Sequence, residues 1–358
     1  MTFNPPDGKK WPVAVLGATG AVGQTFIRLL ANHPWFEVAE VAASERSEGK
    51  PYREATRWLE GKMPSAVADL IVQPVDPSRI KSSIAFSALD SSVAGDVERA
   101  FAQAGKFVLS NAKNFRMEQD VPLVIPEVNA DHLQILDRQR KERGWSGAIV
   151  TNANCAATVA AVALAPLEEK FGIDKLFLTT MQAVSGAGYP GVPSLDIMGN
   201  VIPYIADEEP KLELEMTKLL GKYTDGAIVR APMKVSSHTN RVAVEHGHTV
   251  CITVALKNPA TLDQVIATLR EWKGNESTLD LPSRPEHPLL VMDEPNRPQP
   301  RRDVNLGNGM TVSVGRIRPD PILDVRMVAL GHNTIRGAAG GSVLNAELLA
   351  VTGRFAPA

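Results

Sequence analysis

The sequence lacks several features that would assign it to a specialised class of protein. Its 358 residues include only two cysteines, Cys155 and Cys251, too few for a disulfide framework or a thiolate zinc site. No apolar run approaches the roughly 20 residues of a membrane helix, and residues 1–10 lack the apolar core of a signal peptide. The net charge of -2 offers no general attraction to nucleic acid or anionic membrane. We therefore expect a cytoplasmic protein without nucleic-acid, membrane or metal partners.

The composition that remains is that of an ordinary globular protein. Hydrophobic residues make up 44% and charged residues 22%, and the length is enough for two domains. Up to residue 150, short β-rich runs alternate with helical patterns, a rhythm typical of βαβ units and a parallel sheet. Strands are predicted at 13–16, 36–43, 84–86, 107–109, 121–125 and 148–151, and helices at 22–31 and from Asp90 and Ser91 onward.

The pattern changes after residue 155. An Ala-rich helix is expected to end near Phe171 and Gly172. Long β-type segments follow at 176–184, 227–232, 241–256 and 324–330, with helices at 208–220 and 262–272. Strands of this length indicate a mixed or antiparallel sheet in a second domain. The proline-rich stretch 294–303 is predicted to be a loop, and a terminal helix at 345–351 is expected to pack back on the first domain.

A glycine-rich segment follows the first strand and opens the first helix. In this setting, a G-x-x-G-x-x-G loop permits a tight turn, and the pyrophosphate of a dinucleotide can sit on the free N–H groups of the helix. The residues predicted to bind the cofactor there are Gly17, Thr19, Gly20, Ala21, Val22 and Gly23.

The end of the second strand indicates which dinucleotide is bound. NAD enzymes place an acidic residue there to bind the ribose hydroxyls. Here the strand is followed by Ser44, Glu45 and Arg46, with Lys50 further on. A hydroxyl and a guanidinium can hold a 2′-phosphate, which a carboxylate would repel. Ser44 and Arg46 therefore predict NADP as the cofactor.

The two cysteines differ in their surroundings. Cys251 lies in the apolar run Val250–Val254 and is expected to be plain core. Cys155 follows Asn152-Ala153-Asn154 between a strand and a helix, where the helix dipole is expected to lower the pKa of the thiol. Neighbouring asparagine and backbone amides could donate to an oxyanion. These features predict a nucleophile at Cys155, with a base at His246 or His248, between which the residues alone do not decide.

Five segments carry a resemblance to a known family. They are Gly17–Gly23, Ser110–Asn114, Asn154-Cys155, Gln182–Gly186 and Gly247–Thr249. Together they resemble the motifs of the aspartate-semialdehyde dehydrogenase family. Two further segments, Pro126–Asn129 and His332–Gly337, resemble its archaeal and fungal branch. The resemblance runs in order over nearly the whole chain.

The resemblance implies roles for the matching residues. Cys155 is similar to the nucleophile, His248 to the acid–base catalyst, and Gln182 to a residue that orients the thioester. Arg241 is similar to the arginine that grips the substrate's α-carboxylate, and Glu208 to the acid that holds its amino group. The remaining matches imply phosphate binding at Lys211 and Arg116 with Asn111 beside them, and nicotinamide contacts at Ser185, Gly186 and Asn333.

Two departures from the family's pattern stand near these residues. Thr239-Asn240-Arg241-Val242-Ala243-Val244 replaces the expected Cys-x-Arg-Val-Pro-Val, although the spacing from Arg241 to His248 is kept. Ala156-Ala157-Thr158 replaces a more hydroxyl-rich run after the cysteine.

The fold implied is α/β, with a Rossmann-type NADP-binding domain and a mixed α/β catalytic and dimerisation domain. The first domain would span residues 1–153, completed by the C-terminal helix 332–358, and the second 154–331. The implied reaction is NADPH-dependent reductive dephosphorylation of L-4-aspartyl phosphate to L-aspartate 4-semialdehyde through a cysteine thioester. It belongs to lysine, threonine and methionine biosynthesis. The family assembles as homodimers or homotetramers.

Three other functions remain open at this point. A malonyl- or succinyl-CoA reductase and an N-acetyl-γ-glutamyl-phosphate reductase also work through a cysteine thioester, and they differ from this reaction in the acyl donor. A redox sensor that binds NADP without turnover would use Cys155 as a reactive thiol, but would need no clamp for carboxylate or phosphate.

The predicted 2′-phosphate contact can be tested at Arg46. We expect Arg46→Ala to raise the KM for NADP much more than the KM for NAD, because only NADP carries the phosphate. Steady-state kinetics with both cofactors measure this. Equal shifts in the two KM values, or no shift in either, would contradict the assignment.

Overall fold

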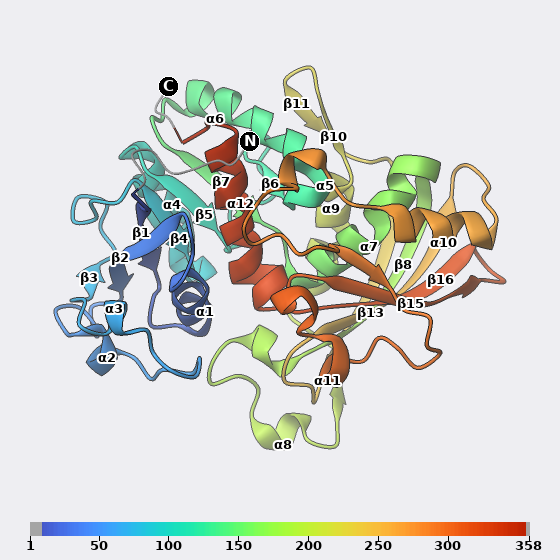
Figure 1. Ribbon diagram of the computed structural model, residues 1–358, viewed down its shortest axis with the longest axis horizontal. Coiled ribbons are helices and arrows are strands. Elements are labelled where there is room, and N and C mark those ends of the chain that lie inside the picture. The colour runs from blue at the N-terminus through green and yellow to red at the C-terminus, as the bar shows by residue number, and fades with distance from the viewer. Residues whose placement is uncertain (1–8, 356–358) are drawn as a thin grey trace.

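The computed structural model describes residues 9–355, which form two seven-stranded sheets with helices packed around them (Figure 1). Most of the N-terminal segment judged above for a signal peptide, and the last three residues of the expected C-terminal region, lie outside the described residues. Within residues 9–355, no helix is both long and apolar enough to cross a membrane.

The first sheet is parallel throughout, as predicted, with the order β3-β2-β1-β4-β5-β7-β6. Its strands are β1 (Trp11–Leu16), β2 (Phe36–Ala43), β3 (Gln73–Pro74), β4 (Ile84–Ser87), β5 (Phe107–Ser110), β6 (Leu123–Val124) and β7 (Ala148–Asn152). The helices of this region are α1 (Ala21–Leu30), α2 (Tyr52–Ala55), α3 (Ser65–Ala68), α4 (Ser91–Gln103), α5 (Pro126–Asn129), η2 (Ala130–Ile135) and α6 (Leu136–Arg143). Helix α4 begins where expected because the Asp90 side chain accepts the N–H of Ser92.

The second sheet is mixed, also as predicted, with the order β14-β15-β16-β13-β8-β12-β9. Its strands are β8 (Ile173–Gln182), β9 (Val201–Ile202), β12 (Lys234–Val242), β13 (His248–Leu256), β14 (Leu289–Val291), β15 (Val312–Pro319) and β16 (Val325–Gly331). A separate hairpin pairs β10 (Lys222–Thr224) with β11 (Ala227–Val229). The helices are α7 (Cys155–Phe171), η3 (Val184–Ala187), α8 (Ser194–Ile197), α9 (Glu208–Leu219), α10 (Leu262–Glu271), η4 (Glu276–Thr278), α11 (Pro300–Asp303) and η5 (Leu306–Gly309).

The Ala-rich helix α7 covers one face of the second sheet. It packs against β13, β15 and β16 and against the helices α9 and α10. Small alanine side chains permit this close approach, and the helix is buried from Ala156 to Leu167. Because side chains alternate along a strand, Cys251 points to the opposite face of the sheet, beside Thr179 and Val328. There it is only partly buried, so the expectation that Cys251 is plain core is wrong.

Three predicted segments differ in detail. The β-type segment 241–256 is two strands, because β12 runs parallel to β8 and β13 antiparallel to it, so the chain must turn between them. Gly247 makes that turn with a φ of 101°. The strand expected at 227–232 is confined to the short hairpin strand β11, and the predicted loop 294–303 contains the one-turn helix α11.

The chain ends by returning to the first sheet. A π-helical turn (η6, Ile335–Ala339) leads into α12 (Gly340–Val351), which is longer than the predicted 345–351. Helix α12 packs on β5 and β7 and lies between the two sheets in Figure 1. The expected division after residue 153 falls between β7 and α7, and these domain bounds remain a prediction.

The returning segment is fixed by a buried ion pair. Both terminal nitrogens of Arg336 donate to Glu127 in α5, at 2.7 and 2.9 Å. The two side chains are 1% and 0% exposed.

Arg336→Met tests this anchor. We expect the free energy of unfolding to fall by about 3–5 kcal/mol, because Glu127 would be left buried without a partner. Urea denaturation measures the loss. Arg53→Met is the matched control, since the Arg53–Asp69 pair is exposed and should change stability by less than about 0.5 kcal/mol. Equal effects of the two substitutions would contradict the anchoring role.

Candidate active site

Cys155 is the first residue of α7, directly after the strand β7 of the first sheet. The preceding residue, Asn154, caps the helix, and its side-chain oxygen accepts the N–H groups of Ala156 at 2.8 Å and Ala157 at 3.1 Å. This cap explains why the helix begins here. The thiol therefore lies between a strand of the first sheet and a helix that packs on the second, and its place between a strand and a helix is as predicted.

His248 is the nearest titratable neighbour of the thiol. It opens β13, and its Nε2 lies 3.0 Å from Cys155 Sγ. The backbone N–H of Ala183 donates to Nδ1 at 3.1 Å, so the neutral ring carries its proton on Nε2, facing the sulfur. In this resting tautomer His248 is a donor. It becomes the expected base only when the bond from Ala183 is given up.

The predicted lowering of the thiol pKa is wrong. Burial raises the pKa of Cys155 to about 12, and the Glu208 carboxylate adds to this, while Arg116 and Arg241 oppose it. Burial, with the positive charge of Arg241, lowers the pKa of His248 to about 3. Loss of hydration therefore outweighs the helix dipole at this thiol, and both partners are neutral at rest.

Glu208 and Gln182 meet around Asn154. Glu208 Oε1 accepts from the side-chain amides of Asn154 at 2.8 Å and Gln182 at 3.1 Å. One N–H of the Asn154 amide is thus bound to Glu208, and donation to an oxyanion by its other N–H or by neighbouring backbone amides remains a prediction. Lys211 Nζ lies 3.9 Å from Glu208 Oε2, one helical turn further along α9.

Arg116 follows strand β5 of the first sheet, and its guanidinium donates two hydrogen bonds. Its Nη1 donates to Glu215 at 2.9 Å, and its Nη2 donates to the carbonyl oxygen of Asn111 at 2.8 Å. Its Nε is buried without a partner. The Asn111 side chain accepts from Asn152 at 3.2 Å and donates to the Ser87 carbonyl at 3.1 Å. Asn111 thus holds Arg116 through its backbone carbonyl and is itself held by Asn152 and Ser87.

Arg241 is the penultimate residue of β12 and lies beside the histidine. Its Nη1 donates to the carbonyl oxygen of Ala183 at 2.8 Å, so Arg241 and His248 are held by the same residue. Gly186 faces both, since a Cβ there would lie 2.9 Å from Arg241 Nη1 and 3.1 Å from His248 Cε1. Any side chain at Gly186 would displace these two groups. Burial lowers the pKa of Arg241.

The glycine-rich turn has the shape that a dinucleotide requires. Gly17 has a φ of 74°, and a Cβ there would lie 2.6 Å from the carbonyl oxygen of Ala88. A Cβ on Gly23 would lie 2.3 Å from the carbonyl oxygen of Gly17. Gly20 caps α1 without any side chain to accept its first N–H groups. The turn Gly17–Gly23 therefore fits the pyrophosphate of NADP.

Two pairs of residues are proposed for the two ends of the cofactor: Ser44 and Arg46 for the 2′-phosphate, and Ser185 and Asn333 for the nicotinamide. Ser44 and Arg46 follow β2 and are exposed, and Lys50 Nζ donates to the carbonyl oxygen of Arg46 at 2.8 Å. Asn333 and Ser185 are joined by a bond of 2.8 Å from the amide to the hydroxyl. Both ends keep polar groups that fit a 2′-phosphate and a nicotinamide.

His246, the alternative histidine, has other partners. Its Nδ1 lies 3.1 Å from Ser185 Oγ, and its ring stacks on His332 with centroids 4.9 Å apart. The structure thus places His248 beside the thiol and His246 on the side of Ser185.

Three contacts were missed at the sequence level. A Cβ on Gly337 would lie 2.6 Å from the Cβ of Cys155, so η6 forms a wall of the site. Ala183 orders His248 and Arg241 through its backbone, which no side-chain pattern reports. Glu215 accepts the backbone N–H of Asn154 at 2.6 Å, and its spacing of two helical turns from Glu208 was the available signal.

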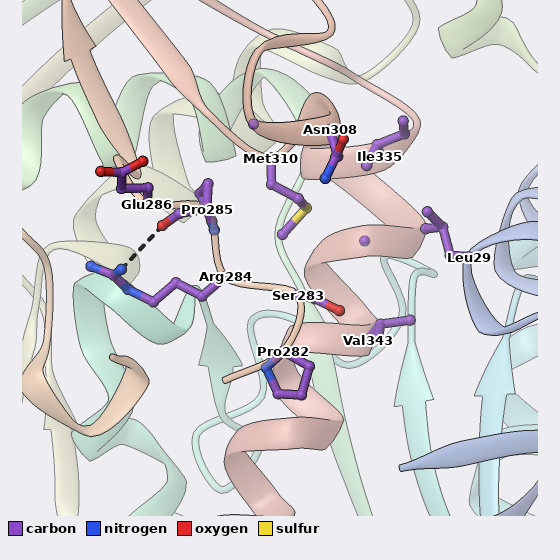
Figure 2. A pocket seen from close by; sticks show the side chains of 12 residues that line it. Leu29, Pro282, Ser283, Arg284, Pro285, Glu286, Asn308, Met310, Ile335 and Val343 are labelled. Carbon is purple, nitrogen blue, oxygen red and sulfur yellow. Dashed lines mark hydrogen bonds between the residues drawn. The ribbon is translucent and has the colours of Figure 1, made fainter. Parts of the chain in front are cut away.

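A separate hollow of about 330 Å³ lies between α1, α12 and segment 282–286 (Figure 2). Its wall is about half polar: Leu29, Met310, Ile335 and Val343 line it together with Ser283, Arg284, Glu286 and Asn308, and Arg284 donates to the carbonyl oxygen of Pro285. None of the predicted site residues lines this hollow, so it is distinct from the site at Cys155.

Comparisons with known proteins agree with this geometry. Residues 12–136 match the semialdehyde dehydrogenase NAD binding domain, and residues 164–336 match the semialdehyde dehydrogenase dimerisation domain. Curated proteins named aspartate-semialdehyde dehydrogenase are similar over most of their length. One from Archaeoglobus fulgidus is 49% identical, covering 95% of this chain and 98% of that protein, and one from Saccharomyces cerevisiae is 47% identical, covering 96% and 98%.

The chain belongs to the aspartate-semialdehyde dehydrogenase family. A solved structure of the Candida albicans family member with NADP has a TM-score of 0.88 and 44% identity, covering 96% of this chain and 99% of that one. A Vibrio cholerae enzyme, aspartate semialdehyde dehydrogenase II, has a TM-score of 0.74 and 28% identity, covering 96% and 99%. The resemblance inferred from the motifs, including its archaeal and fungal branch, is confirmed.

The raised thiol pKa predicts how Cys155 responds to pH. We expect the rate of its alkylation by iodoacetamide to keep rising through pH 9, about tenfold per unit, because only the thiolate reacts. Peptide mapping by mass spectrometry separates Cys155 from Cys251. Cys155→Ser should lose turnover and retain NADP binding. A rate for Cys155 that is constant above pH 7 would contradict the raised pKa.

Proposed function

We propose that the protein catalyses the NADPH-dependent reductive dephosphorylation of L-4-aspartyl phosphate to L-aspartate 4-semialdehyde, in the biosynthesis of lysine, threonine and methionine. The observation that supports this most is the contact of 3.0 Å between Cys155 Sγ and His248 Nε2, with Arg116 and Arg241 near enough for their charges to lower the pKa of the thiol. Identity of 44–49% to curated family members supports the same reaction.

Cys155 carries the acyl group in this proposal. In the oxidative direction its thiolate adds to the aldehyde carbon, and the tetrahedral oxygen bears the negative charge. His248 acts as the acid–base catalyst: once the bond from Ala183 is given up, its Nε2 takes the thiol proton, gives it to the tetrahedral oxygen, and takes the hydroxyl proton back as hydride leaves. Bound NADP would supply the hydride acceptor, and NADPH the hydride donor in the biosynthetic direction. The resulting thioester is cleaved by phosphate, which forms the acyl phosphate and releases the thiolate.

The charged groups around the thiol determine which substrate fits. Arg241 is proposed to hold the α-carboxylate, and Glu208 the amino group. Arg116 and Lys211 are proposed to hold the phosphate, and Gln182 to orient the acyl group. A guanidinium and an ammonium favour a compact phosphate dianion close to the carbonyl. Coenzyme A carries its phosphates far from that carbon, so the acyl phosphate is favoured over a CoA thioester.

The alternatives differ from this proposal in what they would bind. An N-acetylated substrate would offer Glu208 no ammonium group. A redox sensor would not need Arg241 and Arg116 beside the thiol. The coupled oxidation of aspartate semialdehyde with phosphate and NADP tests the activity directly.

The match to a dimerisation domain indicates that copies of this chain associate. We infer a homodimer or a homotetramer, which sedimentation equilibrium distinguishes. The cytoplasmic location expected from the composition remains a prediction.

Substitutions can distinguish the proposed phosphate-binding role of Lys211 from the proposed carboxylate-binding role of Arg241. We expect Lys211→Ala to raise the KM for phosphate by about tenfold or more, because a charge-assisted bond is lost, with little change in the KM for NADP. Arg241→Ala should instead raise the KM for aspartate semialdehyde. Steady-state kinetics in the oxidative direction measure both. Rapid reduction of malonyl-CoA, without any phosphate-dependent oxidation of aspartate semialdehyde, would overturn the substrate and keep the thioester chemistry.

A further inference from the structure

One buried carboxylate links the phosphate side of the site to the nucleophile. Glu215 lies on α9, two turns after Glu208 and on the same face of the helix. Its side chain is 2% exposed. One oxygen accepts from Arg116 Nη1 at 2.9 Å, and the other accepts the backbone N–H of Asn154 at 2.6 Å. The next residue after Asn154 is Cys155.

Each end of this bridge is also held by a second residue of α9. Asn154 is fixed through its side chain by Glu208 and by the first turn of α7. The loop that carries Arg116 is fixed by Lys218, whose Nζ donates to the carbonyl oxygens of Arg116, Glu118 and Val121 at 2.7, 2.8 and 2.7 Å. Glu215 is therefore the one residue of α9 that bonds directly to both the Arg116 guanidinium and the Asn154 backbone, between two parts that Glu208 and Lys218 dock on the same helix.

The charge of Glu215 matters as much as its position. Arg116 is buried and lowers the pKa of the Cys155 thiol. A carboxylate 2.9 Å from its guanidinium offsets that positive charge at the sulfur while no phosphate is bound.

We propose that Glu215 is a positioning residue that holds Arg116 and Cys155 in the relative geometry needed for exchange between the thioester and phosphate. In this step a phosphate oxygen bonds to the thioester carbon, the carbon–sulfur bond breaks, and the electron pair returns to Cys155 as thiolate. Arg116 must place the phosphate against a carbon whose position Asn154 determines, and an error of about 1 Å in such an approach costs about 100-fold in rate. The inference rests on the proposed function above.

The substitution Glu215→Gln tests the bridge with little change in volume. An amide offers one acceptor oxygen, so either Arg116 or the Asn154 N–H would face another donor. We expect kcat/KM for phosphate to fall by about 10- to 100-fold, with the KM for NADP unchanged. The rate of Cys155 alkylation at pH 8 should rise severalfold, because the charge of Arg116 is no longer offset. A carboxylate that only stabilised the fold would, when replaced, also change the KM for NADP and the alkylation of Cys251.

Glu213→Gln is the matched control on the same helix. Glu213 accepts from the backbone N–H of Ser237 at 2.9 Å and is not fully buried. The same chemical change there should leave phosphate kinetics and Cys155 alkylation as in the wild type. Alkylation of Cys251, measured in the same digests, reports any general loosening of the fold, and it should be unchanged in Glu215→Gln.

If Glu215→Gln does not fold, Glu215→Asp serves in its place, because it keeps the charge but is too short to reach both donors. We then expect a fall in kcat for phosphate-dependent oxidation without faster alkylation. Wild-type phosphate kinetics and wild-type alkylation in whichever variant folds would overturn the proposal. A wild-type enzyme without phosphate-dependent activity would instead overturn the proposed function, while the alkylation assay still tests the bridge.

Discussion

The arrangement of the site depends on the fixing of Asn154 by two buried carboxylates. Glu208 accepts from its side chain and Glu215 from its backbone, and both come from α9. Because Asn154 also caps α7, these contacts determine where the helix starts and hence where Cys155 lies. A helix of the second half of the chain thereby positions a thiol at the edge of the first sheet. The residues around the thiol are arranged relative to that one fixed point.

Burial then determines the chemistry of the pair. A thiol and an imidazole out of water both favour their neutral forms, and the bond from Ala183 keeps the proton of His248 on the nitrogen that faces the sulfur. Arg116 and Arg241 favour the thiolate, and Glu208 opposes it. The state of the sulfur therefore depends on which anions occupy the site, because a bound phosphate or carboxylate changes the charge that these groups present.

Much of this could be predicted from local patterns. The strands of the first sheet and the start of α4 follow from short apolar runs and a capping aspartate, which are properties of neighbouring residues. The break between β12 and β13 was missed because both have strand-like residues, and the reversal depends on how each pairs with β8. Cys251 was misplaced for a related reason, since alternation assigns it to one face but does not say which face is covered. Glu215 resembles a solvated helix charge until Arg116 and Asn154 are brought to it by the fold.

The contact between Gly337 and Cys155 also constrains how the protein is made. The wall that Gly337 forms belongs to a segment more than 180 residues after the thiol in the chain, and domains of a nascent chain fold in the order of synthesis. Asn154 and the carboxylates of α9 are synthesised before η6, so the side of the thiol that η6 covers is completed last. The thiol is thus synthesised well before the last wall of its pocket.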